Sequence, residues 1–119
     1  MKVVINKCFG GFGISLQAAR FMAERGNELA KKEVAAYDAK KADPDSLDYF
    51  EKKHGVRWYG GGSYERNDPA LVAAVETLGE DANDEYSNLR VIEIPDGTDY
   101  EIDEYDGIEH IAEKHRTWG

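Results

Sequence analysis

The order of hydrophobic and polar residues predicts how the chain begins. A run of consecutive apolar residues indicates a short strand over residues 2–6, covered on both faces. A glycine-rich turn follows, and apolar positions with helical spacing begin at Leu16. Ser15 is suited to cap the first turn of that helix, and Gly26 is suited to end it. We therefore expect a strand, a tight turn and a helix.

The middle of the chain is expected to be mainly helical. Residues 27–41 are rich in Ala, Lys and Glu, and predict either a second helix or an extension of the first. Asp-Pro pairs start two further helices, over residues 45–53 and residues 69–78, because Pro is well tolerated in a first helical turn. Between them, residues 56–59 indicate a brief strand. The three glycines that follow, residues 60–62, fit a mobile loop or a close backbone approach.

The last third of the chain predicts a group of antiparallel strands. Asp106-Gly107 is a strong signal for a tight turn between the last two. Apolar and polar side chains alternate, as in half-exposed strands, over residues 89–94, 98–105 and 108–113, after an acidic connector at 80–88. The fold class is therefore α+β, a mostly antiparallel sheet with helices packed on one side. At 119 residues we expect one domain, 1–119, with residues 27–64 as a variable helical and Gly-rich insertion.

The charge balance narrows the class of partner. The chain has 15 Lys and Arg against 24 Asp and Glu, a formal net charge of −9. Because a chain this acidic repels the phosphates of DNA and RNA, we expect no nucleic-acid polymer as a partner. The net charge is still compatible with binding of a small anion in a local basic pocket. Cys8 is the only cysteine, which excludes an intramolecular disulfide and fits a reducing, cytoplasmic compartment. No stretch approaches a membrane span, so we expect no membrane partner.

The glycine-rich turn is the first candidate site. A dinucleotide-binding fingerprint would need a glycine where Leu16 stands, and a P-loop would need a lysine before Ser15, so both motifs fail. The backbone amides of residues 11–15 could still form a nest for an anion. The alternative is a tight turn whose two phenylalanines fill the core. The candidate ligand-binding residues of this turn are Phe9, Gly11, Phe12, Gly13 and Ser15.

Three clusters that pair arginine with an aromatic ring form the second candidate site. Arginine makes two-pronged contacts with phosphate, and Trp or Tyr offers a face on which a base stacks. The alternative is that each arginine pairs with an acidic neighbour and each tryptophan fills the core. The candidate residues in and beside these clusters are Arg57, Trp58, Tyr59, Arg66, Asn67, His115, Arg116, Thr117 and Trp118.

The sequence contains no coherent catalytic set. Cys8 with a histidine is the only nucleophilic pair to consider, and a lone thiol beside a buried strand is usually inert. His110 and His115 lie on opposite faces of a hairpin strand because they are five residues apart, which argues against a metal site. The acidic residues within 99–106 are most simply the solvated face of a strand. We therefore expect a protein that is not an enzyme and needs no cofactor.

Three segments resemble a family of small proteins of tailed phages and prophages. They comprise 50 of the 119 residues and read NKCFGGFGIS, RNDPALVAAVETLG and EIPDGTDYEIDEYDGIEHIAEKHRTW. That family is similar in turn to the Thoeris anti-defence sponge proteins, which capture cyclic ADP-ribose isomers, and in some members cyclic oligonucleotides, without cleaving them. The resemblance implies a phage-encoded, non-catalytic protein that sequesters a small anionic nucleotide in the cytoplasm of the infected host cell. It assigns no binding residue.

Two other functions stay open. The acidic hairpin over residues 99–113 could mimic nucleic acid and block a basic surface of a host defence protein, as anti-CRISPR or anti-restriction proteins do. An enzyme could instead act on nucleotides through Cys8 and a histidine. Because small-ligand pockets in domains of this size often form between subunits, we also expect a homodimer or higher homo-oligomer.

Overall fold

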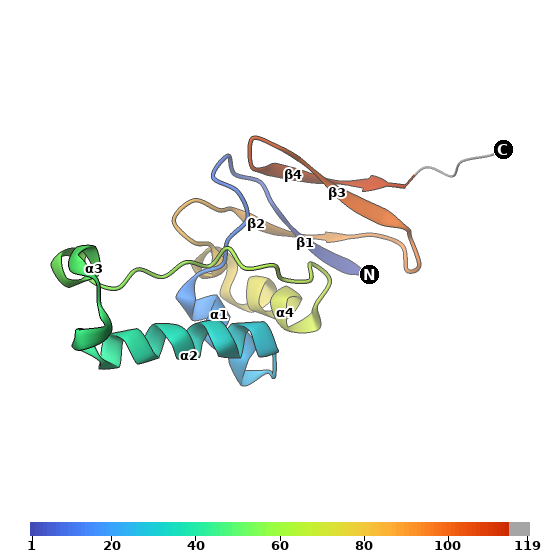
Figure 1. Ribbon diagram of the computed structural model, residues 1–119. Helices are drawn as coiled ribbons and strands as arrows, with labels where there is room; N and C mark the ends of the chain where they lie inside the picture. The colour runs from blue at the N-terminus through green and yellow to red at the C-terminus, as the bar shows by residue number, and fades with distance from the viewer. Residues whose placement is uncertain (115–119) are drawn as a thin grey trace.

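The computed structural model describes residues 1–114 and has the predicted α+β fold (Figure 1). Its strands are β1 (Lys2–Asn6), β2 (Leu89–Glu93), β3 (Tyr100–Tyr105) and β4 (Ile108–Glu113). Its α-helices are α1 (Leu16–Glu24), α2 (Glu28–Ala42), α3 (Tyr49–His54) and α4 (Pro69–Leu78). Short 3-10 helices follow α2 and α4, at Pro44–Ser46 and Gly79–Ala82, so part of the predicted acidic connector is helical.

The strands form two antiparallel pairs, where we had expected one sheet. β1 pairs with β2, with Val4 opposite Val91, and β3 pairs with β4. On its other side, β1 does not pair with β4, because a loop and a side chain occupy that edge. The amide of Val4 donates to the carbonyl of Arg66 at 2.8 Å, and the amide of Asn6 donates to the carboxylate of Glu109 at 2.8 Å. A loop and a side chain therefore replace the backbone ladder between the two sheets.

Capping residues set the ends of the helices. The hydroxyl of Ser15 accepts the amide of Ala18, as predicted for the start of α1. Gly26, with φ +91°, follows the end of α1, and the side chain of Asn27 caps a new helix. Residues 27–41 therefore form a separate helix and do not extend α1. The predicted bounds of the helix at 69–78 are confirmed, because Asp68 caps it and a glycine ends it.

The hydrophobic core lies between α1, α4 and the β1–β2 sheet (Figure 1). Met22 of α1, Leu71 of α4 and Val4 of β1 are fully buried there. Each such side chain contributes about 1.5–3 kcal/mol through the apolar surface that it removes from water. Helix α2 packs along α1, and α3 lies beyond the C-terminal end of α2 (Figure 1). The packed core thus holds the segment from α3 to α4 against one side of α1 and α2.

The predicted strand at residues 56–59 is wrong. The structure gives this segment no strand partner, and the chain from Gly55 to Tyr64 runs across the helices without regular structure. A backbone hydrogen bond attaches this segment to the turn before α1: the amide of Ile14 donates to the carbonyl of Gly60 at 3.0 Å. A Cβ on Gly60 would lie 1.8 Å from the carbonyl oxygen of Ile14. The first of the three glycines therefore permits a close backbone approach.

Within residues 1–114, every helix is too short or too polar to cross a membrane.

Candidate functional site

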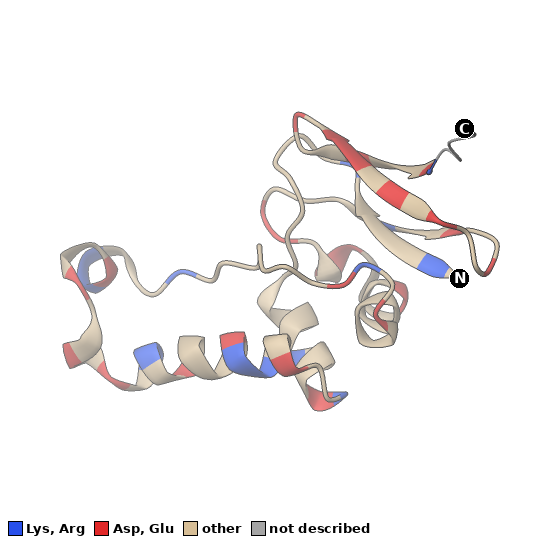
Figure 2. Ribbon diagram, turned by 45° about the vertical axis from the view of Figure 1, so that its right-hand side comes forward, with Lys and Arg blue, Asp and Glu red and all other residues tan. Residues whose placement is uncertain are grey.

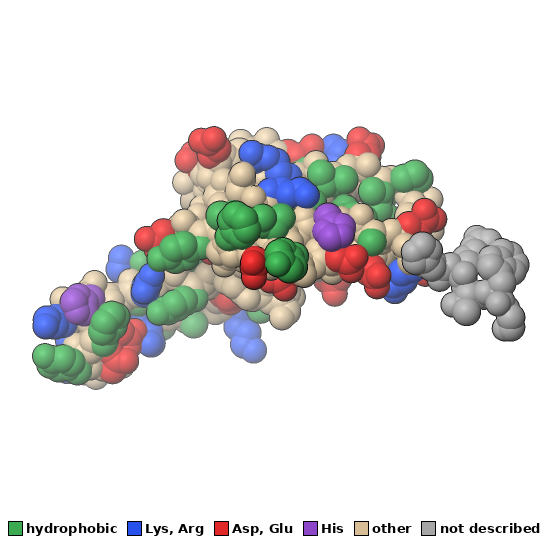
Figure 3. Space-filling model, turned by 90° about the horizontal axis from the view of Figure 1, so that it is seen from above, with side chains coloured by type: hydrophobic (Ala, Val, Ile, Leu, Met, Phe, Trp, Pro, Cys, Tyr) green, Lys and Arg blue, Asp and Glu red, His purple; other side chains and the backbone are tan. Residues whose placement is uncertain are grey.

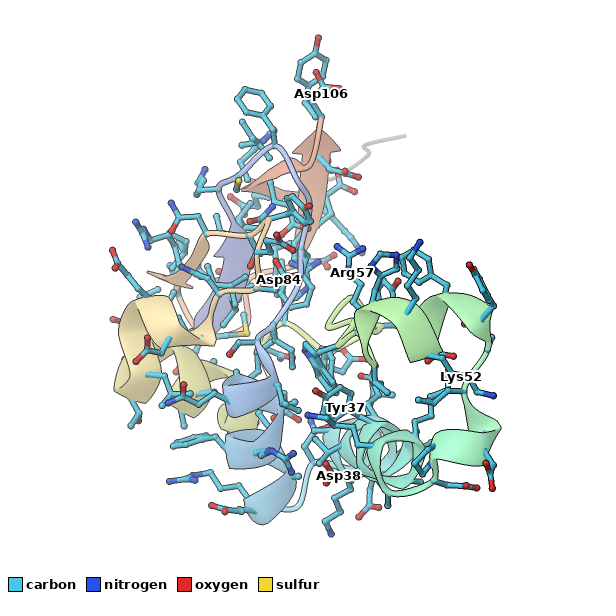
Figure 4. All side chains as sticks on the ribbon, turned by 90° about the vertical axis from the view of Figure 1, so that its left-hand side faces the viewer. Tyr37, Asp38, Lys52, Arg57, Asp84 and Asp106 are labelled. Atoms are coloured by element: carbon cyan, nitrogen blue, oxygen red, sulfur yellow. The ribbon has the colours of Figure 1, made fainter. Side chains whose placement is uncertain are left out.

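Two pockets flank the extended segment that contains three of the predicted site residues, Arg57, Trp58 and Tyr59. The first pocket, of about 430 Å³, lies between this segment and helices α2 and α3, and we call it the aromatic pocket. The second, of about 650 Å³, lies between the same segment, the start of α1 and residues 83–86. Figure 4 shows Arg57 between the loop that carries Asp84 and the helices that carry Tyr37 and Lys52.

Trp58 fixes one wall of the aromatic pocket. Its indole Nε1 donates to the carbonyl of Ile14 at 3.0 Å, so the ring is anchored to the turn before α1. The ring meets Tyr37 of α2 edge to face, with 5.6 Å between the ring centroids and 87° between the planes. Trp58 also packs against the hydrophobic core. The tryptophan therefore joins the core to the pocket, so that it packs in the core, as one of the two alternatives predicts, and also lines a pocket.

Arg57 and Tyr59 are the exposed members of the same wall. The ring of Tyr59 is 70% exposed, and the guanidinium carbon of Arg57 lies 5.7 Å from its centroid. The carboxylate nearest Arg57 is that of Glu85, at 3.6 Å, and both side chains are more than half exposed. An exposed pair at this distance is weak. Arg57 can therefore exchange Glu85 for an anionic group of a ligand at little cost.

The other charged groups of the aromatic pocket are bound to each other or to the backbone. Lys40 lies 2.7 Å from Glu51, whose hydrogen bond raises the pKa of the lysine above its ordinary value. The carboxylates of Asp48 and Glu51 cap α3 reciprocally. Glu33 accepts a hydrogen bond from Tyr64, and burial, followed by this hydrogen bond, raises the pKa of the tyrosine hydroxyl. Arg57 is thus the weakly held cation among the described residues of this pocket.

Three of the five amides of the predicted anion nest are used by the fold. The amides of Gly11, Ile14 and Ser15 donate to backbone carbonyls of three other residues at 3.3, 3.0 and 2.9 Å. A carboxylate also lies against the turn, because a Cβ on Gly13 would be 1.8 Å from Oδ2 of Asp84. The hydroxyl of Ser15 caps α1 and donates to a carbonyl at 2.5 Å. These three amides and the hydroxyl are used by the fold, and the carboxylate of Asp84 beside Gly13 has the wrong sign to attract an anion.

The two phenylalanines of the turn have different environments. Phe12 is partly buried against the core, with the guanidinium of Arg66 3.7 Å from its ring centroid. Phe9 is 72% exposed and contributes little to the core. The alternative in which both rings fill the core therefore holds for Phe12 alone.

Two further predicted residues, Arg66 and Asn67, do not line the aromatic pocket. Arg66 forms a two-pronged ion pair with Glu109, and the two side chains are only 19% and 8% exposed. Asn67 lines a separate shallow pocket beside Lys2 and Pro69. The predicted residues at the C-terminus lie outside the described part of the chain: His115, Arg116, Thr117 and Trp118.

Sequence reasoning missed the helical wall of the pocket. Residues 27–41 looked like a solvated helix, yet Glu33, Tyr37 and Lys40 all line the pocket. Their spacing of four and three places them on one face of α2, and this spacing was the available signal. Phe50 of α3, which is 55% exposed, completes the rim. Phe50 could not be assigned to the pocket from the sequence, because its position depends on the turn between α2 and α3, which the sequence does not position.

Aromatic rings, carboxylates and two cations make up most of the lining of the aromatic pocket. None of its lining residues is Ser, Thr, Cys or His, and no group of three or more metal-ligating side chains occurs within residues 1–114. Of the histidines in that range, His54 packs against Phe50, with ring centroids 4.6 Å apart, and His110 lies 3.5 Å from Asp103. The walls offer flat rings for stacking and one available cation.

Comparisons of this chain with protein-family models, with curated proteins and with solved structures found no match, so its function is argued from the geometry of the site.

Proposed function

We propose that this chain is a phage-encoded, non-catalytic anti-defence protein that binds a small nucleotide immune signal in the aromatic pocket and so sequesters it. One observation carries the proposal: the weakly paired Arg57 stands beside a pocket of about 430 Å³ whose walls include Tyr37, Phe50, Trp58 and Tyr59. The pocket volume lies within the range of small-molecule sites, about 300–1,000 Å³.

The three parts of a nucleotide match three features of the pocket. A base can stack on Tyr59 or Phe50, whose rings are exposed, because every base has a π-face. A phosphate can bind Arg57, which lines both pockets and whose weak partner Glu85 lies on the side of the second pocket. The carboxylates of Glu33 and Glu51 keep lone pairs that can accept ribose hydroxyls. With a single available arginine, the pocket favours a ligand that presents one phosphate to it at a time.

Calorimetry with cyclic ADP-ribose isomers and cyclic di- and trinucleotides tests the proposal directly. We expect binding by at least one of them, and recovery of that ligand unchanged by chromatography after long incubation. Arg57→Ala should weaken binding about tenfold or more, because it removes a charge-assisted hydrogen bond. Arg25→Ala is the matched control, since Arg25 also lies on an aromatic ring, that of Phe21, but outside the pocket. Absence of binding at high micromolar concentration would overturn the proposal.

The proposal includes a homodimer or higher homo-oligomer. Phe50 and Tyr59 are 55% and 70% exposed at the pocket, so a second subunit could cover them and enclose the ligand. Light scattering coupled to size exclusion, with and without ligand, measures the assembly. A monomer in both conditions would contradict this part of the proposal and leave the pocket assignment intact.

A further inference from the structure

We propose that a second surface, remote in sequence from the helices of the aromatic pocket, docks a basic, arginine-rich surface of another protein. This surface, which we call the aromatic tip, is formed by the exposed rings of Phe9, Tyr86 and Tyr105. The inference does not depend on the nucleotide-binding proposal.

Close backbone packing brings these three residues together from distant parts of the sequence. A Cβ on Gly10 would lie 2.3 Å from Cβ of Tyr86, so the turn at Phe9 lies directly against residue 86. On its other side, a Cβ on Gly107 would lie 2.3 Å from the carbonyl oxygen of Phe9. The β3–β4 hairpin, which places Tyr105 two residues before Gly107, is thereby pressed onto the same turn. The glycine-rich turn therefore organises this surface.

The exposure of the three rings is unusual for residues of this size. The exposed fractions are 72% for Phe9, 56% for Tyr86 and 77% for Tyr105. Single exposed aromatic residues are common, but a group of them on adjoining segments is typical of an interaction site. Tyrosine is also among the residues that contribute most to binding energy at protein interfaces. Seen from above, exposed hydrophobic side chains lie beside both acidic and basic ones (Figure 3).

The charge around the aromatic tip indicates what binds it. Exposed carboxylates adjoin two of the tip residues in the sequence, Glu85 beside Tyr86 and Glu104 and Asp106 beside Tyr105, whereas the exposed cation next to Phe9 is Lys7, two residues before it. Acidic residues recur along β3 (Figure 2). Glu104 and Asp106 flank Tyr105 in the sequence, and neither forms an ion pair within residues 1–114. The carboxylates are therefore available to a cationic partner.

Arginine fits this combination better than lysine. A guanidinium stacks on an aromatic face and still reaches a carboxylate with two parallel hydrogen bonds, whereas an ammonium is a compact, strongly hydrated charge. A nucleic acid is excluded as occupant by the sign of the charge. A small anion is excluded for the same reason. The surface therefore suits the arginine-rich face of a protein, such as one that itself binds nucleic acid.

Fluorescence anisotropy with labelled nona-arginine and nona-lysine peptides tests the inference on the full chain. We expect nona-arginine to bind about threefold or more tightly than nona-lysine. Tyr105→Ala and Phe9→Ala should remove most of that preference. Glu104→Lys should weaken both peptides and reduce the salt dependence. Tyr49→Ala, at a ring that is 81% exposed on α3, is the matched control and should change nothing.

Three outcomes would overturn the inference: equal affinity for the two peptides, a preference that survives both tip substitutions, or self-association of the chain that the tip substitutions abolish. The last would identify the occupant as a second copy. Thermal melts of Phe9→Ala and Tyr105→Ala serve as folding checks, because both side chains are mainly exposed. Phe50→Ala, at the rim of the aromatic pocket and away from Tyr86, should leave peptide binding unchanged, so failure here is distinguishable from failure of the nucleotide proposal.

Discussion

Arg66 and Glu109 join the two sheets through a two-pronged ion pair, with Nη2 of the arginine 2.8 Å from Oε2 of the glutamate. The same carboxylate accepts the amide of Asn6, and the guanidinium lies over the ring of Phe12. Both charged side chains are largely removed from water, at 19% and 8% exposed. The arginine that looked like a phosphate ligand in the sequence is therefore a structural link between β1 and β4.

Removing one partner of this pair should destabilise the protein strongly. We expect Glu109→Ala to lower the free energy of unfolding by about 3 kcal/mol or more, because the charge of Arg66 and the amide of Asn6 lose their partner. Glu109→Gln keeps an acceptor for the amide and should cost less. Urea denaturation measures both variants. A Glu109→Ala protein as stable as the original would show that the link contributes nothing.

Adjacent glycines in the 60–62 run should respond in opposite ways to alanine. Gly60→Ala places a Cβ 1.8 Å from the carbonyl oxygen of Ile14 and should cost about 1–3 kcal/mol through overpacking. Gly61→Ala meets nothing closer than 4.0 Å and should stay within about 0.5 kcal/mol, or stabilise slightly through the unfolded state. Neither glycine has a positive φ, so the comparison isolates the steric term. Equal denaturation midpoints for the two variants would contradict the close approach.

Tyr64 should make the protein less stable at high pH. Its hydroxyl donates to Glu33, and burial raises its pKa above the ordinary value of 10.0. The unfolded chain loses this proton near pH 10 while the folded chain keeps it, so stability is present below pH 10 and falls as the pH rises further. We expect Tyr64→Phe to show a shallower decline of the melting temperature above pH 10. Tyr49→Phe, as control, should keep the steep decline.

The ion pair between α1 and α2 should give a second, acidic, pH dependence. Nη2 of Arg20 lies 2.8 Å from Oδ1 of Asp38, and this hydrogen bond lowers the pKa of the aspartate below its ordinary value of 3.8. Because the pKa of Asp38 is lower in the folded than in the unfolded protein, the ion pair stabilises the fold above pH 3.8. This contribution is lost as the pH falls through the lowered pKa. Asp38→Asn should therefore lower the melting temperature slightly at neutral pH and leave it unchanged in strong acid. A constant difference at every pH would contradict this origin.

Local signals in the sequence were sufficient for most of the helices. Ser15 and Asp68 cap α1 and α4 where the sequence placed them, because N-capping involves residues only a few positions apart. The strand predicted at residues 56–59 failed for the opposite reason. Its aromatic residue, Trp58, suits a strand, but the segment packs against helices and bonds to Ile14 through the indole. Strand formation needs a partner, which propensity alone does not supply.

The site shows the same division between local and distant contacts. The Arg57–Tyr59 cluster could be identified from residue types, because stacking and charge are properties of the side chains themselves. Residue types alone do not show whether the amides of the predicted anion nest are free to bind an anion. Whether an amide is free depends on residues far along the chain, such as Ala82, which accepts the amide of Ser15. The role of Arg66 likewise depended on Glu109, 43 residues away in sequence.

The hydrogen bonds along β1 bear on how the protein behaves at high concentration. One side of β1 pairs with β2, and on the other side the amides of Val4 and Asn6 are taken by Arg66 and Glu109. An edge on which the amides of Val4 and Asn6 are already bonded within the molecule is a poor template for strand addition by a neighbouring chain. The loop at Arg66 and the side chain of Glu109 thus cover the outer edge of the most apolar strand and oppose edge-to-edge aggregation there.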